Sequence, residues 1–239
     1  MELIEYLQEF IFLDIETVSD KLSYDDLDER MQLLWDKKAK QWDASKSAAE
    51  LYPKAALLPE FGKIIVIGVG FFHQGKDREI NFRVKAFKND DEKVLLTDFK
   101  NLVEKKFKSD DLRFVAHNGK GFDFPYLARR MMVQGIRLPK ALQLYGKSPW
   151  QIPHVDTMEM WRMGDIRTFV SLDLLTALFE LPSSKTALDG GKVNETYYHE
   201  KDLEKIAQYC LGDVVATARV YLRMMSIPDL KEENIIYTP

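Results

Sequence analysis

Two carboxylates stand two residues apart near the end of an apolar run, Phe10-Ile11-Phe12-Leu13-Asp14-Ile15-Glu16-Thr17. A run of this kind is typical of a strand buried on both faces. Because strand side chains alternate, Asp14 and Glu16 should leave the same face, one pleat apart. Burying one unpaired carboxylate is costly, and two close together also repel each other. The pair therefore predicts that something cationic binds at this place.

Two later segments carry further candidates. Asp123 follows a glycine-bearing turn and opens a predicted helix, where taken alone it is typical of an N-terminal residue favoured by the helix dipole. Tyr209 and Asp213 are four residues apart on one flank of the apolar stripe of a long predicted helix. An aspartate beside a buried helix face requires a partner, whereas a tyrosine there is more often half-buried packing.

Together these segments supply four carboxylates: Asp14, Glu16, Asp123 and Asp213. Carboxylate oxygens are hard ligands that suit magnesium or manganese rather than zinc. Four of them from three elements can hold two divalent ions roughly 3.5–4 Å apart, the arrangement used for in-line displacement at phosphorus. One ion would generate a hydroxide and the other would stabilise the leaving oxygen.

The elements that must position these residues follow from the hydrophobic pattern. We predict strands at 10–17, 63–72, 80–87, 113–117 and 153–155, and helices at 90–107, 122–134, 157–163, 172–179 and 200–225. This order indicates an α/β fold with a mixed five-stranded sheet and helices on both faces, a ribonuclease-H-like architecture. The acidic first strand is expected at the centre of a three-strand meander.

The chain as a whole, residues 1–239, is predicted to be a single domain with a helical insertion at about 19–60. The insertion fits either a solvated amphipathic hairpin or a lid or clamp near the site. A single cysteine, Cys210, excludes an internal disulfide, and no apolar run or signal-peptide pattern indicates a membrane or export. We therefore expect a cytoplasmic protein.

The formal net charge of −4 argues against a protein that coats nucleic acid by bulk electrostatics. It remains compatible with an enzyme that contacts a few phosphates locally, because bound metal ions would neutralise the most acidic patch.

Three segments resemble the exonuclease motifs of the DEDD superfamily. Phe12–Thr17, Asn118–Asp123 and Tyr209–Asp213 are similar, in that order, to the patterns D-x-E, N-x-x-x-F-D and Y-x-x-x-D. From residue 10 to about 223, the chain most resembles predicted 3′–5′ exonucleases related to the proofreading domain of family B DNA polymerases. The histidine branch of the superfamily would have histidine at Gln208, whereas the tyrosine branch has tyrosine at Tyr209, so the resemblance is to the tyrosine branch.

The resemblance implies a role for each motif residue. Asp14, Glu16 and Asp213 would hold the nucleophile-side metal. Asp14 would also bridge to the second ion, which Asp123 would bind mostly through water. Tyr209 would orient the attacking water rather than remove its proton, because a tyrosine hydroxyl has a pKa of about 10. The implied cofactors are two divalent ions, Mg²⁺ or Mn²⁺.

The resemblance also implies a substrate, single-stranded or 3′-ended nucleic acid that is shortened to nucleoside monophosphates. Thr17 and the backbone after Glu16 would meet the terminal nucleotide, and Asn118 and Phe122 would support the site, Phe122 by stacking. DNA is favoured by the resemblance to the polymerase branch. RNA trimming stays open, because discrimination depends on contacts to the 2′-hydroxyl. A nucleic-acid-binding module with little activity is the other alternative.

Several charged residues have simpler explanations. Asp156 has capping-box spacing to Glu159, so it is interpreted as a helix cap rather than a fifth ligand. His117 and His154 lie at strand ends and are predicted to be structural hydrogen-bonding residues. Four cations that could touch phosphate are interpreted as solvated charges: Lys120, Arg129, Lys185 and Lys192.

A glycine turn and one rival enzyme family were also considered in the interpretation of the sequence. The Gly190-Gly191 turn could border a substrate groove. A haloacid-dehalogenase-type phosphatase would also begin with a strand ending Asp-x-Asp-x-Thr. Here Glu16 replaces the second aspartate, so this interpretation is not favoured.

Overall fold

A mixed sheet of six strands runs through the computed structural model, which describes residues 3–75, 79–106, 112–183 and 188–238. The strands are β1 (Phe10–Ser19), β2 (Gly62–Gln74), β3 (Ile80–Lys88), β4 (Arg113–Ala116), β5 (Val155–Asp156) and β6 (Ile235–Thr238). Their spatial order is β5-β4-β1-β2-β3-β6. The β1–β2 and β2–β3 pairs are antiparallel, whereas β1–β4, β4–β5 and β3–β6 are parallel.

The prediction of a five-stranded sheet is wrong, because the sheet has a sixth strand, β6. The sequence prediction ends at residue 225, whereas Ile235–Thr238, a short β-branched and aromatic run, pairs in parallel with β3. The strand order also corrects the position of the acidic strand. The centre of the three-strand meander is β2, and β1 lies between β2 and β4. The acidic strand is therefore an interior strand of the whole sheet.

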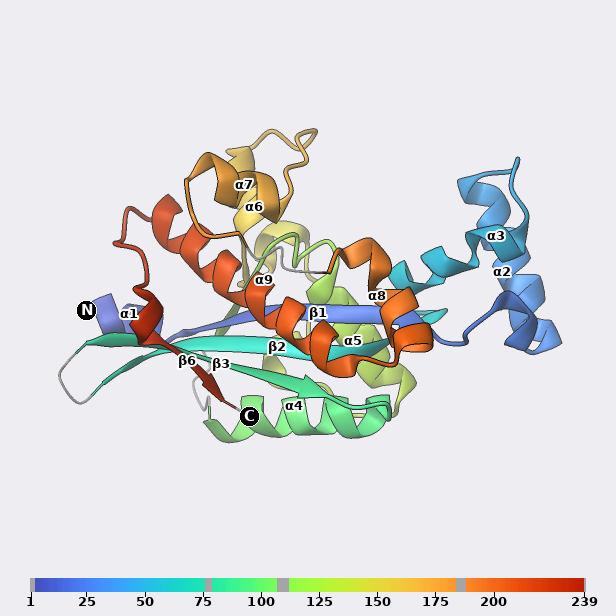
Figure 1. Ribbon diagram of the computed structural model, residues 1–239, viewed down its shortest axis with the longest axis horizontal. Helices are drawn as coiled ribbons and strands as arrows, with labels where there is room; N and C mark the ends of the chain where they lie inside the picture. Colours follow the sequence, from blue (N-terminus) through green and yellow to red (C-terminus); the bar gives the residue numbers. More distant parts are fainter. Residues whose placement is uncertain (1–2, 76–78, 107–111, 184–187, 239) are drawn as a thin grey trace.

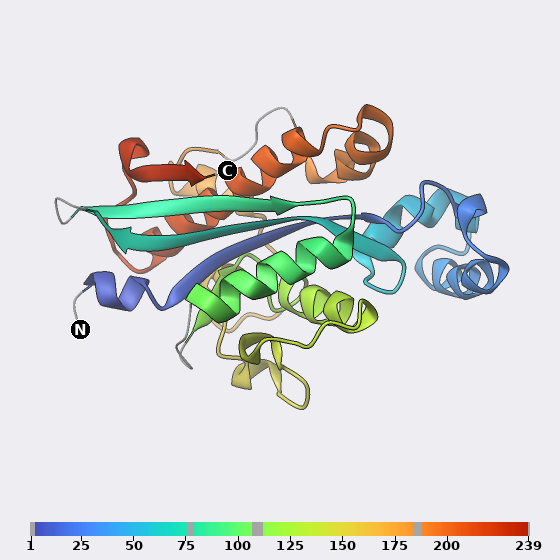
Figure 2. The ribbon, with the colours of Figure 1, turned by 90° about the horizontal axis from the view of Figure 1, so that it is seen from below.

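Helices cover both faces of the sheet, as predicted (Figures 1 and 2). The α-helices are α1 (Leu3–Leu7), α2 (Glu29–Trp42), α3 (Ala48–Leu51), α4 (Glu92–Lys106), α5 (Asp123–Val133), α6 (Thr157–Arg162), α7 (Leu172–Leu178), α8 (Val193–Glu195) and α9 (Leu203–Met224). Phe107, the predicted end of the helix that contains α4, lies outside the described residues. Within those residues, no helix has both the length and the apolar character needed to cross a bilayer.

Alternation along β1 sends its side chains into two separate cores. Ile11, Leu13 and Ile15 pack in the core that includes α4 and α5. Phe10 and Phe12 pack in the core that includes α9. Because strand side chains have a period of two, the even-numbered residues that follow continue the α9 side. The acidic residues of β1 therefore face the last long helix.

The insertion between β1 and β2 has a core of its own and extends from one end of the sheet (Figure 1). Trp35 of α2 is fully buried, and its ring lies 5.5 Å from that of Tyr52 and 5.1 Å from that of Phe61. The Trp35 indole N–H donates a hydrogen bond to the Ala48 carbonyl at 2.8 Å. Trp35 and Ala39 are the buried residues of α2, and its other residues are partly or fully exposed, so the insertion packs one apolar side around a tryptophan.

A buried ion pair between α4 and α5 holds the end of the insertion against these two helices. Arg130 of α5 donates to Glu92 of α4 through Nε (2.9 Å) and Nη2 (2.6 Å), and its Nη1 donates to the Pro59 carbonyl at 2.8 Å. The Glu92 carboxylate also accepts from the backbone N–H of Ile64 at 2.8 Å. The chain leaving the insertion is thus held against α5.

Candidate active site

Asp14 and Glu16 lie on the same face of β1, as predicted. Their partners across the ladder in β2 are Gly68 and Val66, and the register shifts directly after Glu16. Glu16 is 7% exposed. A carboxylate oxygen from each residue and the Cys210 sulfur lie within 4.8 Å of one another, which is close enough for both carboxylates to share a cation.

Asp123, the first residue of α5, joins these two carboxylates. The residue is 4% exposed, and its Oδ1 accepts a hydrogen bond from the Ile15 backbone N–H at 3.2 Å. Ile15 lies between Asp14 and Glu16 in β1. The third carboxylate is therefore tied directly to the strand that carries the first two.

The helix α9 brings Tyr209 and Asp213 to the same place. Both side chains are half-buried, and Cys210 between them donates a weak hydrogen bond from its thiol to the Asp14 carbonyl at 3.5 Å. The charge of Asp213 acts on Asp14, Glu16 and Asp123, which shows that the fourth carboxylate lies near the other three.

A glycine in β2, which the sequence reasoning missed, allows this approach. A Cβ built on Gly68 would lie 2.8 Å from the Cys210 sulfur and 2.9 Å from Val214 Cγ2. Since Gly68 is the ladder partner of Asp14, a side chain there would push α9 away from the carboxylates. Glycines inside an apolar strand often mark such close contacts, so Gly68-Val69-Gly70 was the available signal.

The electrostatics of the cluster favour a bound cation. Burial raises the pKa of Asp14 well above its usual range, and the neighbouring charge of Glu16 raises it further. Burial likewise raises the pKa of Glu16, and it raises the pKa of Asp123 to about 7. The buried Oδ2 atom of Asp14 has no hydrogen-bond partner among the described residues.

No cationic side chain compensates the charges of Asp14, Glu16 and Asp123 within the part of the chain that the structure describes. No lysine or arginine there forms an ion pair with Asp14, Glu16 or Asp123. Buried carboxylates without a cationic side chain suit divalent metal ions, which prefer carboxylate oxygens. The donor set therefore fits magnesium or manganese.

The hydroxyl of Tyr209 stays protonated in this environment. Burial raises the pKa of Tyr209 far above its usual value, and the charges of Asp213 and Glu16 and a hydrogen bond with Asp213 raise it further. A Cβ built on Gly190 would lie 3.5 Å from the Tyr209 hydroxyl oxygen. The Gly190-Gly191 turn thus borders the tyrosine, and it leaves room beside the hydroxyl.

The three residues predicted to contact substrate lie around the cluster with different partners. The Thr17 hydroxyl donates to the Ala56 carbonyl at 2.8 Å, so it binds the insertion in this structure. Asn118 has a positive φ of 62°, and its Oδ1 lies beside Gly121, where a Cβ would come within 2.6 Å. The Phe122 ring is partly exposed and lies 5.2 Å from the Tyr126 ring.

Asp156 is the predicted helix cap and does more besides. It accepts from the backbone N–H of Met158 at 3.0 Å at the start of α6. It also accepts from the backbone N–H groups of Asn118 (2.9 Å) and Lys120 (3.0 Å). Asp156 therefore fixes the turn that leads into Asp123. Sequence reasoning missed this second role, because the turn lies almost forty residues away.

His117 and His154 are structural hydrogen-bonding residues, as predicted. The ring of His117 contacts the Thr157 hydroxyl (2.9 Å) and the Val170 carbonyl (2.8 Å). The Phe114 N–H donates to Nδ1 of His154 at 3.1 Å, which places the His154 proton on Nε2, 2.8 Å from the Ala141 carbonyl.

The four cations interpreted as solvated charges have different surroundings. Lys120 is paired with Glu159 at 2.7 Å, and Lys192 is exposed. Lys185 lies outside the described residues. Arg129 is also exposed, but it lines a pocket between α5 and the insertion.

A mixed sheet flanked by helices, with carboxylates from β1, α5 and α9 at one place, is consistent with a ribonuclease-H-like exonuclease fold. Residues 57–235 match the family described as predicted 3′–5′ exonucleases related to the exonuclease domain of PolB, and the chain belongs to that family. It is therefore an enzyme of the 3′–5′ exonuclease class. Asp123, Tyr209 and Asp213 fall inside the matched region, and Asp14 and Glu16 precede it.

The structure is similar to that of the family B DNA polymerase from the hyperthermophilic archaeon Pyrobaculum calidifontis. The TM-score is 0.51 at 16% sequence identity, and the match covers 91% of this chain. It covers 24% of the polymerase chain, so this chain spans about a quarter of the length of that protein. At this identity the similarity supports the fold alone.

Proposed function

We propose that this protein is a 3′–5′ exonuclease of the tyrosine branch of the DEDD superfamily, which requires two divalent ions and releases nucleoside monophosphates. The observation that carries the proposal is the meeting of Asp14, Glu16 and Asp123 beside Tyr209 and Asp213, with a buried Asp14 oxygen that lacks a hydrogen-bond partner among the described residues. The family match supports the direction of hydrolysis.

Asp14, Glu16 and Asp213 would hold one ion, and Asp14 and Asp123 the other. When bound, Mg²⁺ or Mn²⁺ ions would supply activation of the attacking water and stabilisation of the leaving oxygen. Asp123 keeps its carboxylate near β1 through the hydrogen bond from Ile15. The protein would thus supply a set of oxygen ligands from one strand and two helices.

Tyr209 is assigned the positioning of the attacking water. Because its raised pKa keeps the hydroxyl protonated, the side chain offers a donor and lone pairs rather than a base. In the proposed reaction the water oxygen bonds to phosphorus and releases a proton, while the bond from phosphorus to the 3′ oxygen of the preceding nucleotide breaks and that oxygen takes up a proton. The product is a nucleoside 5′-monophosphate, and the shortened strand keeps a 3′ hydroxyl.

The proposed substrate is the 3′ end of DNA, supported by the relation of the family to the exonuclease domain of a DNA polymerase. The test uses purified protein with Mn²⁺ and a single strand labelled at either end, as DNA and as RNA of the same sequence. A 5′ label should yield a ladder of shortened strands, and a 3′ label should be released at once as a mononucleotide. Internal cuts, or shortening from the 5′ end only, would reject the proposal.

Asp14→Asn provides the control for this digestion. The change keeps the size of the side chain but removes the charge that the two proposed ion sites share, so turnover should be abolished. Faster digestion of RNA than of DNA would identify RNA as the preferred substrate and would leave the proposed site unchanged.

A further inference from the structure

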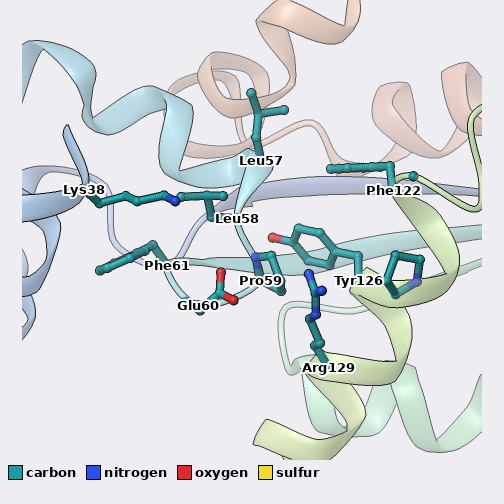
Figure 3. Close-up of a pocket in the computed structure, with 11 residues that line it drawn as sticks. Lys38, Leu57, Leu58, Pro59, Glu60, Phe61, Phe122, Tyr126 and Arg129 are labelled. Carbon is teal, nitrogen blue, oxygen red and sulfur yellow. The ribbon is translucent and has the colours of Figure 1, made fainter. Parts of the chain in front are cut away.

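A pocket of about 440 Å³ lies between the insertion and α5 (Figure 3). Its insertion side is formed by Lys38 of α2 and by Leu57 to Phe61, and its other side by Phe122, Tyr126 and Arg129. This volume is within the range of sites that take small ligands. The pocket therefore lies at the junction between the core of the insertion and the core that includes α5.

The charged side chains at this pocket are two cations and one anion: Lys38, Arg129 and Glu60. Figure 3 shows Lys38 on one side of the pocket and Arg129 on the other, on different elements. Within the described residues, neither cation forms an ion pair with an acidic side chain. The pair is thus available to an anionic ligand.

Apolar and aromatic groups lie beside these cations. Leu57 is 56% exposed although it is apolar, and the partly exposed Phe122 ring lies along the same upper side of the pocket in Figure 3. Cations interleaved with exposed apolar and aromatic surface fit a single nucleic-acid strand, whose phosphates and unpaired base faces are both accessible.

The pocket borders elements that carry part of the carboxylate cluster. Phe122 directly precedes Asp123 in the chain. On the insertion side, the Ala56 carbonyl accepts from the Thr17 hydroxyl (2.8 Å) and from the Tyr126 hydroxyl (2.9 Å). These two bonds fix the residue before Leu57 to β1 and to α5. A strand in the pocket would therefore have a fixed position relative to Asp14 and Asp123.

We infer that the insertion is a substrate-binding wall, and that the pocket takes one nucleotide of a single strand next to the bond that is cut. Lys38 and Arg129 contact phosphate, and Leu57 contacts a base. This inference rests on the proposed function and adds Lys38 and Arg129 as residues that bind substrate. It also assigns a role to the insertion, which packs around a core of its own.

The test measures binding separately from turnover. A 5′-fluorescein-labelled single strand of about ten thymidine nucleotides is titrated by anisotropy with Asp14→Asn protein at several salt concentrations. Lys38→Ala and Arg129→Ala, each added to that background, should weaken binding about tenfold. Each should also reduce the salt slope by about 0.7, the value for one phosphate contact of a single strand. Glu60→Gln should instead tighten binding about two- to fivefold.

Lys40→Ala and Arg137→Ala are matched controls, since both side chains are exposed and lie outside the pocket. Binding and salt slope should be unchanged in these variants. In otherwise wild-type protein, the two pocket variants should raise KM about tenfold and change kcat less than twofold, as uniform substrate binding requires.

The possible outcomes separate this inference from the proposed function. If the wild-type protein shortens strands but the pocket variants bind like the two controls, the inference is overturned and the exonuclease proposal stands. If the wild-type protein shortens no strand but binding still depends on Lys38 and Arg129, the exonuclease proposal fails and the pocket remains a nucleic-acid site. No measurable binding of the strand overturns the inference as well.

Discussion

The Asp123 side chain accepts a hydrogen bond from the backbone N–H of Ile15, just beyond the point where β1 stops pairing with β4. The β1–β4 ladder pairs Phe10, Ile11 and Phe12 with residues 113–115, and it ends there. Ile15, three residues further along, is paired by a side chain from α5 instead. A carboxylate of the site thus satisfies a buried backbone donor of the strand that carries Asp14 and Glu16.

This double role predicts different outcomes for two substitutions of Asp123. Both Asp123→Asn and Asp123→Ala should abolish exonuclease activity, because both remove the ligand charge. Only asparagine keeps an oxygen for the Ile15 N–H, so the alanine variant should be less stable than the asparagine variant by about 1–3 kcal/mol. Urea unfolding of the two metal-free variants measures the difference. Equal stabilities would mean that the Ile15 bond contributes nothing.

Tyr209→Phe should lower the rate of hydrolysis by about 10²–10⁴ if the hydroxyl positions the attacking water. Metal binding should stay nearly intact, because the four carboxylates are unchanged. Single-turnover kinetics gives the rate, and the Mn²⁺-dependent rise in Tm reports the metal. Tyr145→Phe is the control, since Tyr145 is 78% exposed. A fully active Tyr209→Phe protein would exclude the tyrosine branch.

The mutual repulsion of the carboxylates predicts an unusual stability effect for Asp213→Asn. Without metal, this variant should be as stable as the wild type or more stable, because it removes one of the charges that act on Asp14 and Glu16. Mn²⁺ should raise the Tm of the wild type and raise that of the variant less.

Thermal unfolding with and without Mn²⁺ measures both effects. Asp98→Asn, on the exposed side of α4, should change neither. A large loss of metal-free stability in Asp213→Asn would identify Asp213 as a structural partner instead of a metal ligand.

His154 predicts a dependence of stability on pH. Burial lowers the pKa of His154 to about 4 from its ordinary value of 6.5, so the unfolded chain binds the proton more readily. Its contribution to stability is fully present above pH 6.5 and is lost as pH falls through 6.5 to about 4, by about 3 kcal/mol in total. His154→Asn keeps an acceptor for the Phe114 N–H but cannot titrate. The variant should therefore show a smaller loss of unfolding free energy between about pH 7 and pH 4.

Comparison with the variant is needed because the carboxylate cluster titrates with the opposite sign. The raised pKa values of Asp14, Glu16 and Asp123 make the metal-free folded state bind protons more readily than the unfolded state. Acid therefore relieves repulsion there. The difference between wild type and His154→Asn cancels that contribution, and equal pH profiles would contradict the prediction.

The sequence predicts those parts of the site in which the relative position of two residues depends on a single strand or helix. Alternation along a strand places Asp14 and Glu16 on one face, and a four-residue helical spacing places Tyr209 above Asp213. Gly68 could not be assigned in this way, because its role depends on the β1–β2 register and on the path of α9 across it. Asp156 likewise required a contact between α6 and a distant turn.

The fold shows the same division. The apolar runs and the alternating pattern predict five strands, whereas β6 lies at the edge of the sheet and is specified by its parallel pairing with β3. The insertion could be delimited from its charge pattern, but its packing around Trp35 depends on Tyr52 and Phe61 meeting in space.

The site takes its residues from the first strand and the last long helix, with Asp14 and Asp213 near opposite ends of the chain. Chains are made from the N-terminus, and contacts between such distant segments close late. A nascent chain would carry Asp14, Glu16 and Asp123 long before α9 is available to supply Tyr209 and Asp213. In the proposed mechanism, hydrolysis would therefore depend on completion of the fold, and an unfinished or truncated chain that lacks α9 would not cut the nucleic acids around it.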